Sequence, residues 1–184
     1  MKTSSHDSQH RPECDQSLAV SKYLMEIGVK PKFLTHPPCR SSAESRLARA
    51  SAGEDVIGAK AIVLMVRRTA AKKREPWLAI LPGDKRLEEK NIKSNDGSIK
   101  SIRFATDDEL AFATGGLVPG TVPPLGKGFF PNITCVLLDD AFVRESTMSV
   151  GFNIGCHTQS AVLNASDLIC IAKPNFVIPL TAPS

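Results

Sequence analysis

The sequence predicts a mixed α+β domain, in which a strongly curved sheet or partial barrel is flanked by short helices. Three observations support this class. Apolar segments typical of strands alternate with short amphipathic segments typical of helices. These segments lack the regular βαβ rhythm and the long crossover helices of a doubly wound sheet. The 184 residues suit one domain that can bury a sizeable core.

Two capping-box patterns indicate where helices begin. Ser41 is followed three residues later by Glu44, and Thr106 is followed by Glu109, so that each hydroxyl and carboxylate can satisfy a free backbone N–H. Helices are therefore predicted from these boxes to near Gly53 and to residues 114–116. Amphipathic or capped segments predict three more helices, at residues 17–27, 86–93 and 164–172.

The clearest strand prediction covers residues 59–66, AKAIVLMV, which are rich in β-formers and apolar on both faces. We expect this strand to be covered on both sides and to pair in a hairpin with residues 77–81. The stretch RRTAAKKREP between them is then an exposed hairpin loop or extended arm. Further strands are predicted at residues 101–104, 133–138, 148–154 and 159–163.

Composition indicates an ordinary soluble protein. Hydrophobic residues make up 42% and charged residues 23%, and the longest apolar run, residues 61–66, is too short to span a membrane. Residues 1–16 are polar and lack the apolar core of a secretory signal, so we expect a flexible tail before a single domain at residues 17–184. Five cysteines without a CxxC pair favour reduced thiols and a cytoplasmic location.

A cluster of positive charge falls in the predicted hairpin loop, at Arg67, Arg68, Lys72, Lys73 and Arg74. Such a cluster can bind nucleic-acid phosphates through electrostatics that do not depend on sequence. The alternative is a solvated hairpin tip without a ligand. The sequence leaves both interpretations open.

Two further features could carry chemistry. The segment GGLVPGTVPPLG, residues 115–126, holds four glycines and three prolines, and such a loop can present backbone N–H groups rigidly to a carbonyl oxygen or a phosphate. Lys60 begins the AIVLMV strand and could anchor a phosphate or a terminal ribose at the mouth of a pocket. The alternative for the loop is a stiff connector between a helix and a strand, and the alternative for Lys60 is a surface lysine at a strand end.

Several functions lack the residues that they need. The four histidines show no metal-ligand spacing, and no GxSxG nucleophile signature is present. The glycine-rich loop has neither a Walker lysine nor a dinucleotide fingerprint. Asp107-Asp108 and Asp139-Asp140 are typical of helix starts. We therefore expect no metal and no cofactor.

Six stretches carry a resemblance to a known family. In chain order they are THPPCRSSAES, AKAIVLMV, LAILPGDKRLEEK, ATDDEL, GGLVPGTVPPLG and FNIGCHTQSAVLNASDL, and the resemblance that they carry runs from about Val20 to Ala172. The sequence resembles the family of YbaK-like and prolyl-tRNA-synthetase-associated editing domains. The resemblance implies the YbaK-like fold and hydrolysis of the ester in wrongly charged tRNA.

The resemblance also implies roles for particular residues. Lys60 matches the lysine that helps these proteins to hold the terminal adenosine of tRNA, and residues 120–124 match their G-x-x-x-P loop, whose backbone lines the aminoacyl pocket. The implied mechanism is attack by water positioned by the ribose hydroxyl of the substrate and by the pocket backbone. The expected catalytic residues are Lys60, Gly120 and Pro124. The expected substrate-binding residues are Gly116, Thr121, Val122, Pro123, Asn153, Gly155 and Ser160.

The amino acid that is removed is implied only as a class. Asn153 stands at a position that is asparagine in alanine-specific members and serine in cysteine-specific ones. Ser160 stands where the cysteine-specific branch has an aspartate, and Gly155 where the alanine-specific branch has a histidine. Because neither branch matches throughout, we expect a small residue: alanine, cysteine, serine or threonine.

Three hypotheses follow for function. The leading one is a free-standing aminoacyl-tRNA deacylase that acts on the acceptor end of mischarged tRNA. The second is a non-catalytic module of the same fold that binds RNA or an aminoacyl-tRNA synthetase through the basic hairpin loop. The third is hydrolysis of another small ester or amide in the same pocket.

Overall fold

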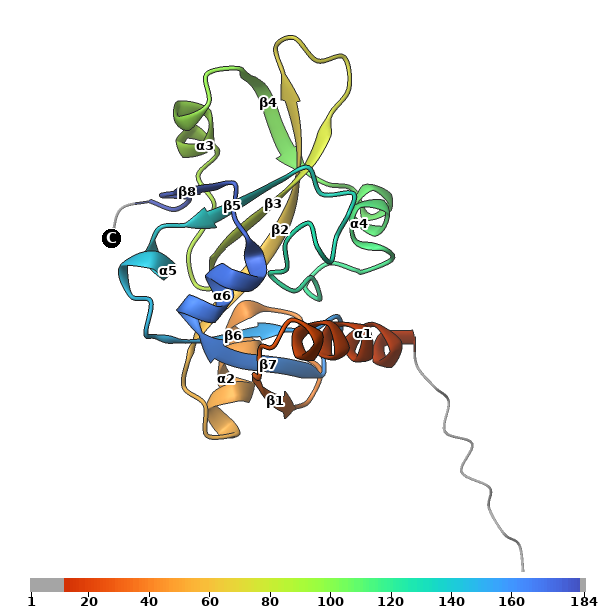
Figure 1. Ribbon diagram of the computed structural model, residues 1–184, viewed down its shortest axis with the longest axis vertical. Helices are drawn as coiled ribbons and strands as arrows, with labels where there is room; N and C mark the ends of the chain where they lie inside the picture. The colour runs from red at the N-terminus through yellow and green to blue at the C-terminus, as the bar shows by residue number, and fades with distance from the viewer. Residues whose placement is uncertain (1–11, 183–184) are drawn as a thin grey trace, which may run out of the picture.

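The computed structural model describes residues 12–182, which form one curved sheet with short helices packed around it (Figure 1). The strands follow the order β1, β7, β6, β2, β3, β5, β8, and β4 pairs with β2 outside this path. The prediction of a mixed α+β domain around a curved sheet is confirmed. The strands are β1 (Lys32–Thr35), β2 (Ile57–Arg68), β3 (Glu75–Pro82), β4 (Ile99–Phe104), β5 (Cys135–Asp139), β6 (Ser149–Asn153), β7 (Gln159–Asn164) and β8 (Phe176–Ile178).

Strand β2 joins the two halves of the sheet. Its first residues, Ile57 and Gly58, pair in parallel with β6, whereas the rest of the strand pairs antiparallel with β3 and β4. Successive residues from Val63 to Val66 are buried. Val63 belongs to one hydrophobic core, and Leu64 belongs to a second core on the opposite face. This arrangement confirms the prediction of a strand covered on both sides.

The helices begin where their caps predict. In α2 (Ser42–Ser51) the Ser41 hydroxyl accepts the N–H of Glu44, and in α4 (Asp107–Thr114) Thr106 and Glu109 form the full reciprocal box. Helix α4 ends at Gly115, whose φ of 74° is left-handed. The remaining helices are α1 (Pro12–Glu26), α3 (Glu89–Asn95), α5 (Ala141–Arg144) and α6 (Ala165–Ala172).

Two predicted helix starts differ from the structure by three residues or more, while the predicted strand ends differ by at most two. Helix α1 begins at Pro12, so residues 12–16 are helical and do not belong to a tail; proline suits the first turn because its missing N–H has no acceptor there. The rest of the predicted tail, residues 1–11, lies outside the described residues. Helix α3 begins at Glu89, three residues later than predicted, because the N–H of Glu88 donates to the carbonyl of Leu180 in an extended segment.

Strands β1 and β8 were not predicted, whereas helix α5 begins directly after Asp139-Asp140, which the sequence indicated as a helix start. Both strands are short and pair with partners far away in sequence: Lys32 opposite Val162 in β7, and Val177 opposite Leu138 in β5. Among residues 12–182 no helix combines the length and the hydropathy that crossing a bilayer requires. The described cysteines Cys39, Cys135, Cys156 and Cys170 carry free thiols.

Candidate functional site

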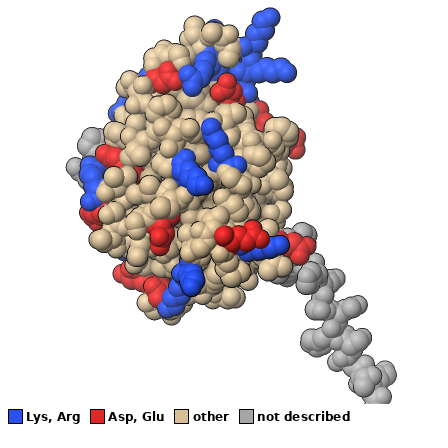
Figure 2. All heavy atoms as spheres, in the orientation of Figure 1, with Lys and Arg blue, Asp and Glu red and all other residues tan. Residues whose placement is uncertain are grey.

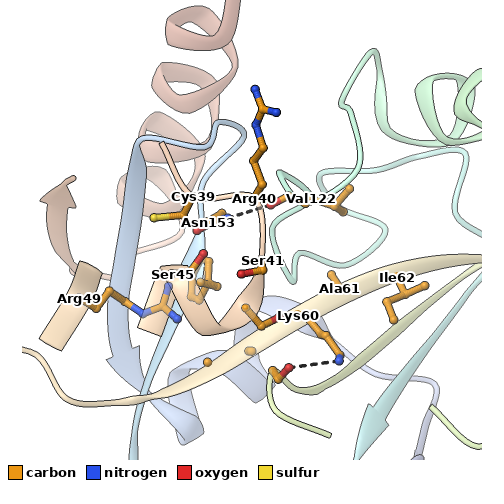
Figure 3. A pocket seen from close by; sticks show the side chains of 16 residues that line it. Cys39, Arg40, Ser41, Ser45, Arg49, Lys60, Ala61, Ile62, Val122 and Asn153 are labelled. Atoms are coloured by element: carbon orange, nitrogen blue, oxygen red, sulfur yellow. Dashed lines mark hydrogen bonds between the residues drawn. The ribbon is translucent and has the colours of Figure 1, made fainter. Parts of the chain in front are cut away.

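A cavity of about 210 Å³ opens beside the start of β2, between the two halves of the sheet (Figure 3). Five segments contribute to its wall: the entry and first turns of α2, the first residues of β2, the turn after β3, the loop 115–126, and the end of β6. The lining residues are Cys39, Arg40, Ser41, Ser42, Ser45, Arg49, Gly58, Ala59, Lys60, Ala61, Ile62, Gly83, Gly120, Val122, Phe152 and Asn153.

The loop 115–126 is held in place by alternate residues at the end of β6. The Asn153 side-chain amide donates to the carbonyl of Gly120 (2.8 Å), and the N–H of Gly155 donates to the carbonyl of Thr121 (3.0 Å). Two residues further on, His157 Nε2 lies 3.2 Å from the carbonyl of Pro119. These contacts fix the loop against the cavity.

The loop also offers backbone donors. Gly120 has a φ of 85°, a left-handed conformation that glycine adopts without strain. In the part of the chain that the structure describes, the N–H groups of Gly120 and Val122 have no hydrogen-bond acceptor, and both residues line the cavity. Backbone N–H groups at such a site can stabilise a carbonyl oxygen that gains negative charge.

Lys60 extends from β2 towards the turn that follows β3 (Figure 3). Its ammonium group donates to the carbonyls of Gly83 (3.2 Å) and Lys85 (2.5 Å). Burial lowers the pKa of Lys60, while the nearby Asp84 carboxylate opposes that shift. An ammonium group has three donors, so these two bonds leave one N–H for a ligand.

Four of the expected site residues line the same cavity: Lys60, Gly120, Val122 and Asn153. The sequence therefore predicted which loop and which strand end meet. The others lie behind this surface. Thr121, Pro123 and Pro124 are buried in the body of the loop.

Three expected residues support the site from a distance. Ser160 contacts Asn153 from β7, with its hydroxyl 3.2 Å from Asn153 Oδ1. Gly155 packs against α1, where an added Cβ would lie 3.0 Å from Gln16. The Gln16 side-chain amide donates to the carbonyl of Gly115 (3.2 Å). The next residue, Gly116, therefore also lies at the contact with α1.

The sequence analysis missed the contribution of α2. Ser41, Ser42 and Ser45 line the cavity from its first turns, and Arg40 points out of it, away from Lys60 (Figure 3). Cys39 is a thiol and not a thiolate, because burial raises its pKa. The lining residues include no histidine, aspartate or glutamate that could act as a general base. The capping box at Ser41 predicted where this helix begins, but no local pattern indicated that its first turns face a cavity.

Arg49, one helical turn after Ser45, was also missed. It is only 2% exposed, and its burial lowers the pKa of the guanidinium group. One nitrogen donates to the Ser160 hydroxyl (3.3 Å), and among the described residues no carboxylate lies within ion-pair distance of Arg49. The sequence held one relevant signal, because glycines inside strands, such as Gly58 and Gly151, often mark a close approach of another group.

The basic loop lies at the other end of β2, at the top of the molecule in Figure 2. Lys72 and Lys73 are exposed at its tip. Arg68 forms an ion pair with Asp96 (2.9 Å) and lies over the Trp77 ring, and the remaining arginines lie at the base of the loop. Because eight residues of extended chain separate Lys60 from Arg68, the loop is roughly 26 Å from the cavity.

Comparisons with known proteins agree with this geometry. Residues 36–170 match the family described as the aminoacyl-tRNA editing domain. The multifunctional Ser/Thr-tRNA deacylase ProXp-y of Escherichia coli K12 is 28% identical over 155 residues, which cover 84% of this chain and 86% of that protein. A second form of that deacylase, from Escherichia coli O157:H7, matches equally well.

Solved structures share the fold. A candidate trans-editing enzyme for prolyl tRNA synthetase superposes with a TM-score of 0.71 at 20% identity, covering 94% of this chain and 99% of that one. A protein described only as hypothetical superposes with a TM-score of 0.64 at 21% identity, covering 85% and 95%. The family match includes every residue that lines the cavity. The chain belongs to the aminoacyl-tRNA editing domain family, and its activity is aminoacyl-tRNA editing.

Proposed function

We propose that this protein hydrolyses the ester bond of tRNA that carries a wrong, small, hydroxyl-bearing amino acid, serine or threonine. One observation carries the proposal: Lys60, the Gly120 loop and Asn153 come from distant parts of the chain and line one cavity. Its volume of about 210 Å³ is below the usual range for drug-sized ligands, which favours a small aminoacyl group. The related deacylase from Escherichia coli acts on Ser- and Thr-tRNA.

In this proposal the two walls of the cavity bind different parts of the substrate. The free N–H of Lys60 binds a phosphate or ribose oxygen of the terminal nucleotide. The N–H groups of Gly120 and Val122 bind the ester carbonyl oxygen. The loop needs no side chain for this task, because its backbone is already fixed by Asn153 and by the N–H of Gly155.

Water is the proposed nucleophile. The Cys39 thiol is protonated, and no acidic or imidazole side chain lines the cavity. The water oxygen bonds to the ester carbon, the bond from that carbon to the ribose oxygen breaks, and a proton from the water passes to the ribose oxygen. An aminoacyl ester is already reactive, so positioning and stabilisation of the oxyanion supply the acceleration.

The basic loop is the proposed contact with the phosphates of the acceptor stem. Lys72 and Lys73 are free of ion pairs among the described residues and are exposed. A separation of roughly 26 Å lets one tRNA molecule reach both the loop and the cavity. In the second hypothesis, a binding module without catalysis, the same loop binds RNA or an aminoacyl-tRNA synthetase. We place this reaction in the cytoplasm, where mischarged tRNA arises.

The test is a deacylation assay on a panel of mischarged tRNAs. We expect wild-type protein to release serine or threonine from at least one tRNA, and Lys60→Ala to lower kcat/KM about a hundredfold. Lys22→Ala removes an exposed charge on α1 and serves as the matched control, with unchanged activity. Wild-type protein that binds tRNA but clears no member of the panel would instead support a binding module of the same fold.

A further inference from the structure

Arg49 is a buried cation that the proposed reaction does not use. Removing a guanidinium group from water is unfavourable unless another charge or a full set of hydrogen bonds offsets the loss. Arg49 has neither: among the described residues it has no carboxylate partner, and its Nε atom is buried without an acceptor. A charge that is buried beside a cavity despite this unfavourable desolvation is a candidate for a functional role.

Two glycines make the space that Arg49 occupies. Gly58 of β2 and Gly151 of β6 lie opposite each other where the two strands pair in parallel. A Cβ on Gly151 would lie 2.6 Å from both Cδ and Nε of Arg49, and a Cβ on Gly58 would lie 3.0 Å from Nη2. No other residue type fits at Gly151 while the guanidinium group stays in place.

The slot directs Arg49 at the Ser160 hydroxyl, which lies among three groups. Arg49 Nη1 is 3.3 Å from the hydroxyl oxygen, His36 Nε2 is 2.8 Å away, and Asn153 Oδ1 is 3.2 Å away. Arginine can only donate, so it uses a lone pair of the hydroxyl oxygen. The hydroxyl has a single proton, and therefore it can donate to His36 or to Asn153, but not to both.

The surroundings of His36 settle this choice. Its Nδ1 lies 2.9 Å from the carbonyl of Pro37, which can only accept. The Cys39 thiol, 3.5 Å from Nδ1, donates to that same carbonyl (3.2 Å), so Nδ1 carries its own hydrogen. In a neutral imidazole Nε2 is then the acceptor, and at 2.8 Å it takes the Ser160 proton. Asn153 Oδ1 is left without a donor from Ser160.

The Asn153 amide cannot flip to exchange the positions of its oxygen and its nitrogen. Its nitrogen donates to the carbonyl of Gly120 at 2.8 Å (Figure 3), so the oxygen must remain at its position 3.2 Å from the Ser160 hydroxyl. Asn153 also lines the cavity. Its oxygen is thus an acceptor that a substrate hydroxyl can satisfy, and a site built in this way discriminates against an analogue that lacks the hydroxyl.

We infer that Arg49 is a positioning residue for substrate selection: by holding the Ser160 hydroxyl, it keeps Asn153 Oδ1 free to accept a hydrogen bond from the hydroxyl of a seryl or threonyl group. The Arg49 N–H occupies a lone pair of the Ser160 oxygen and so restricts rotation of the hydroxyl, whose proton then stays directed at His36. Without Arg49 the hydroxyl can rotate, and Asn153 Oδ1 at 3.2 Å competes with His36 for the single proton. The inference rests on the proposed deacylase function and adds the atoms that recognise the hydroxyl.

The test compares threonyl-tRNA with valyl-tRNA, whose side chains have nearly the same shape and differ by a hydroxyl and a methyl group. The measured quantity is the ratio of the two kcat/KM values, from which the fraction of folded enzyme cancels. We expect wild-type protein to prefer threonyl-tRNA, and Arg49→Met to lower the ratio about tenfold. Arg46→Met, one turn earlier on the same helix with an exposed guanidinium group, should leave the ratio unchanged.

Two further variants separate positioning from mere packing. Adding Ser160→Ala to Arg49→Met removes the hydroxyl that competes for Asn153, so the ratio should recover towards the wild-type value. Gly151→Ala should displace the guanidinium group and lower the ratio as Arg49→Met does.

An unchanged ratio in Arg49→Met, or no recovery in the double variant, would overturn the inference. Equal hydrolysis of both tRNAs by wild-type protein would also overturn it, while the deacylase function would stand. Failure to hydrolyse any mischarged tRNA would remove the proposed function and this inference together.

Discussion

Replacing Lys72 and Lys73 by alanine tests whether the loop between β2 and β3 binds tRNA. Of the five positive residues in and beside this loop, Arg67 and Arg68 lie at the end of β2, where Arg68 is already engaged by Asp96 and Trp77, and Arg74 donates to the carbonyl of Met65. The two lysines at the exposed tip have no such partner among the described residues. They should therefore contribute most of the contact with phosphates.

The magnitude follows from counterion release. Each phosphate contact adds about 0.7 to 0.9 to the negative slope of log K against log salt concentration. Loss of two contacts should make the slope shallower by about 1.4 to 1.8. Affinity should fall for every tRNA alike, because contacts with phosphates carry no sequence information.

The assay is binding of uncharged, fluorescently labelled tRNA over a series of salt concentrations. The matched control is Lys22→Ala/Lys30→Ala, which removes the same net charge from exposed positions in α1 and in the segment that follows it. If both double variants change the slope equally, the effect comes from net charge and not from the loop, and the assignment fails. Hydrolysis of a minimal aminoacyl nucleoside should be unaffected by Lys72→Ala/Lys73→Ala, since the loop is roughly 26 Å from the cavity.

Two predictions concern stability. Glu109 accepts hydrogen bonds from Arg103 and from the N–H of Thr106, and these bonds hold the pKa of Glu109 at about 2, below the usual 4.5. Glu109→Gln should therefore lower the free energy of unfolding by about 1 kcal/mol at neutral pH, allowing for solvent screening. A lowered folded-state pKa stabilises above pH 4.5 and loses its effect as the pH falls towards 2, so urea unfolding of the two proteins should converge over that range, and a constant difference would contradict the assignment. Gly126→Ala would place a Cβ 2.1 Å from the carbonyl oxygen of Ala172 and should cost about 2 kcal/mol or more, measured by the same unfolding curves. Gly97→Ala, with open space around it, should change stability by less than about 0.5 kcal/mol, and an equal effect at both positions would show that Gly126 is not constrained by packing.

The sequence was sufficient where the signal is local. The capping boxes at Ser41 and Thr106 located two helix starts, since both partners of each box lie within four residues. The apolar run in β2 identified a strand buried on both faces. The resemblance to the editing family predicted that Lys60 and Gly120 belong to one site, and both line the same cavity.

The sequence was insufficient where a contact joins distant segments. Residues 17–27 predicted a helix, but its earlier start at Pro12 brings Gln16 against Gly115 and Gly155, which no local pattern shows. Strand β1 exists because β7 offers it an edge. An isolated short segment cannot indicate its partner.

The sequence by itself determined the fold class, the family, and the strand end and loop that carry the proposed chemistry. Tertiary structure alone decided that Arg49 is buried in a slot between Gly58 and Gly151 and directed at Ser160. The physical reason is that burial and hydrogen-bond direction depend on which backbones lie within a few ångströms of each other. Such proximity arises only when strands far apart in the chain pair.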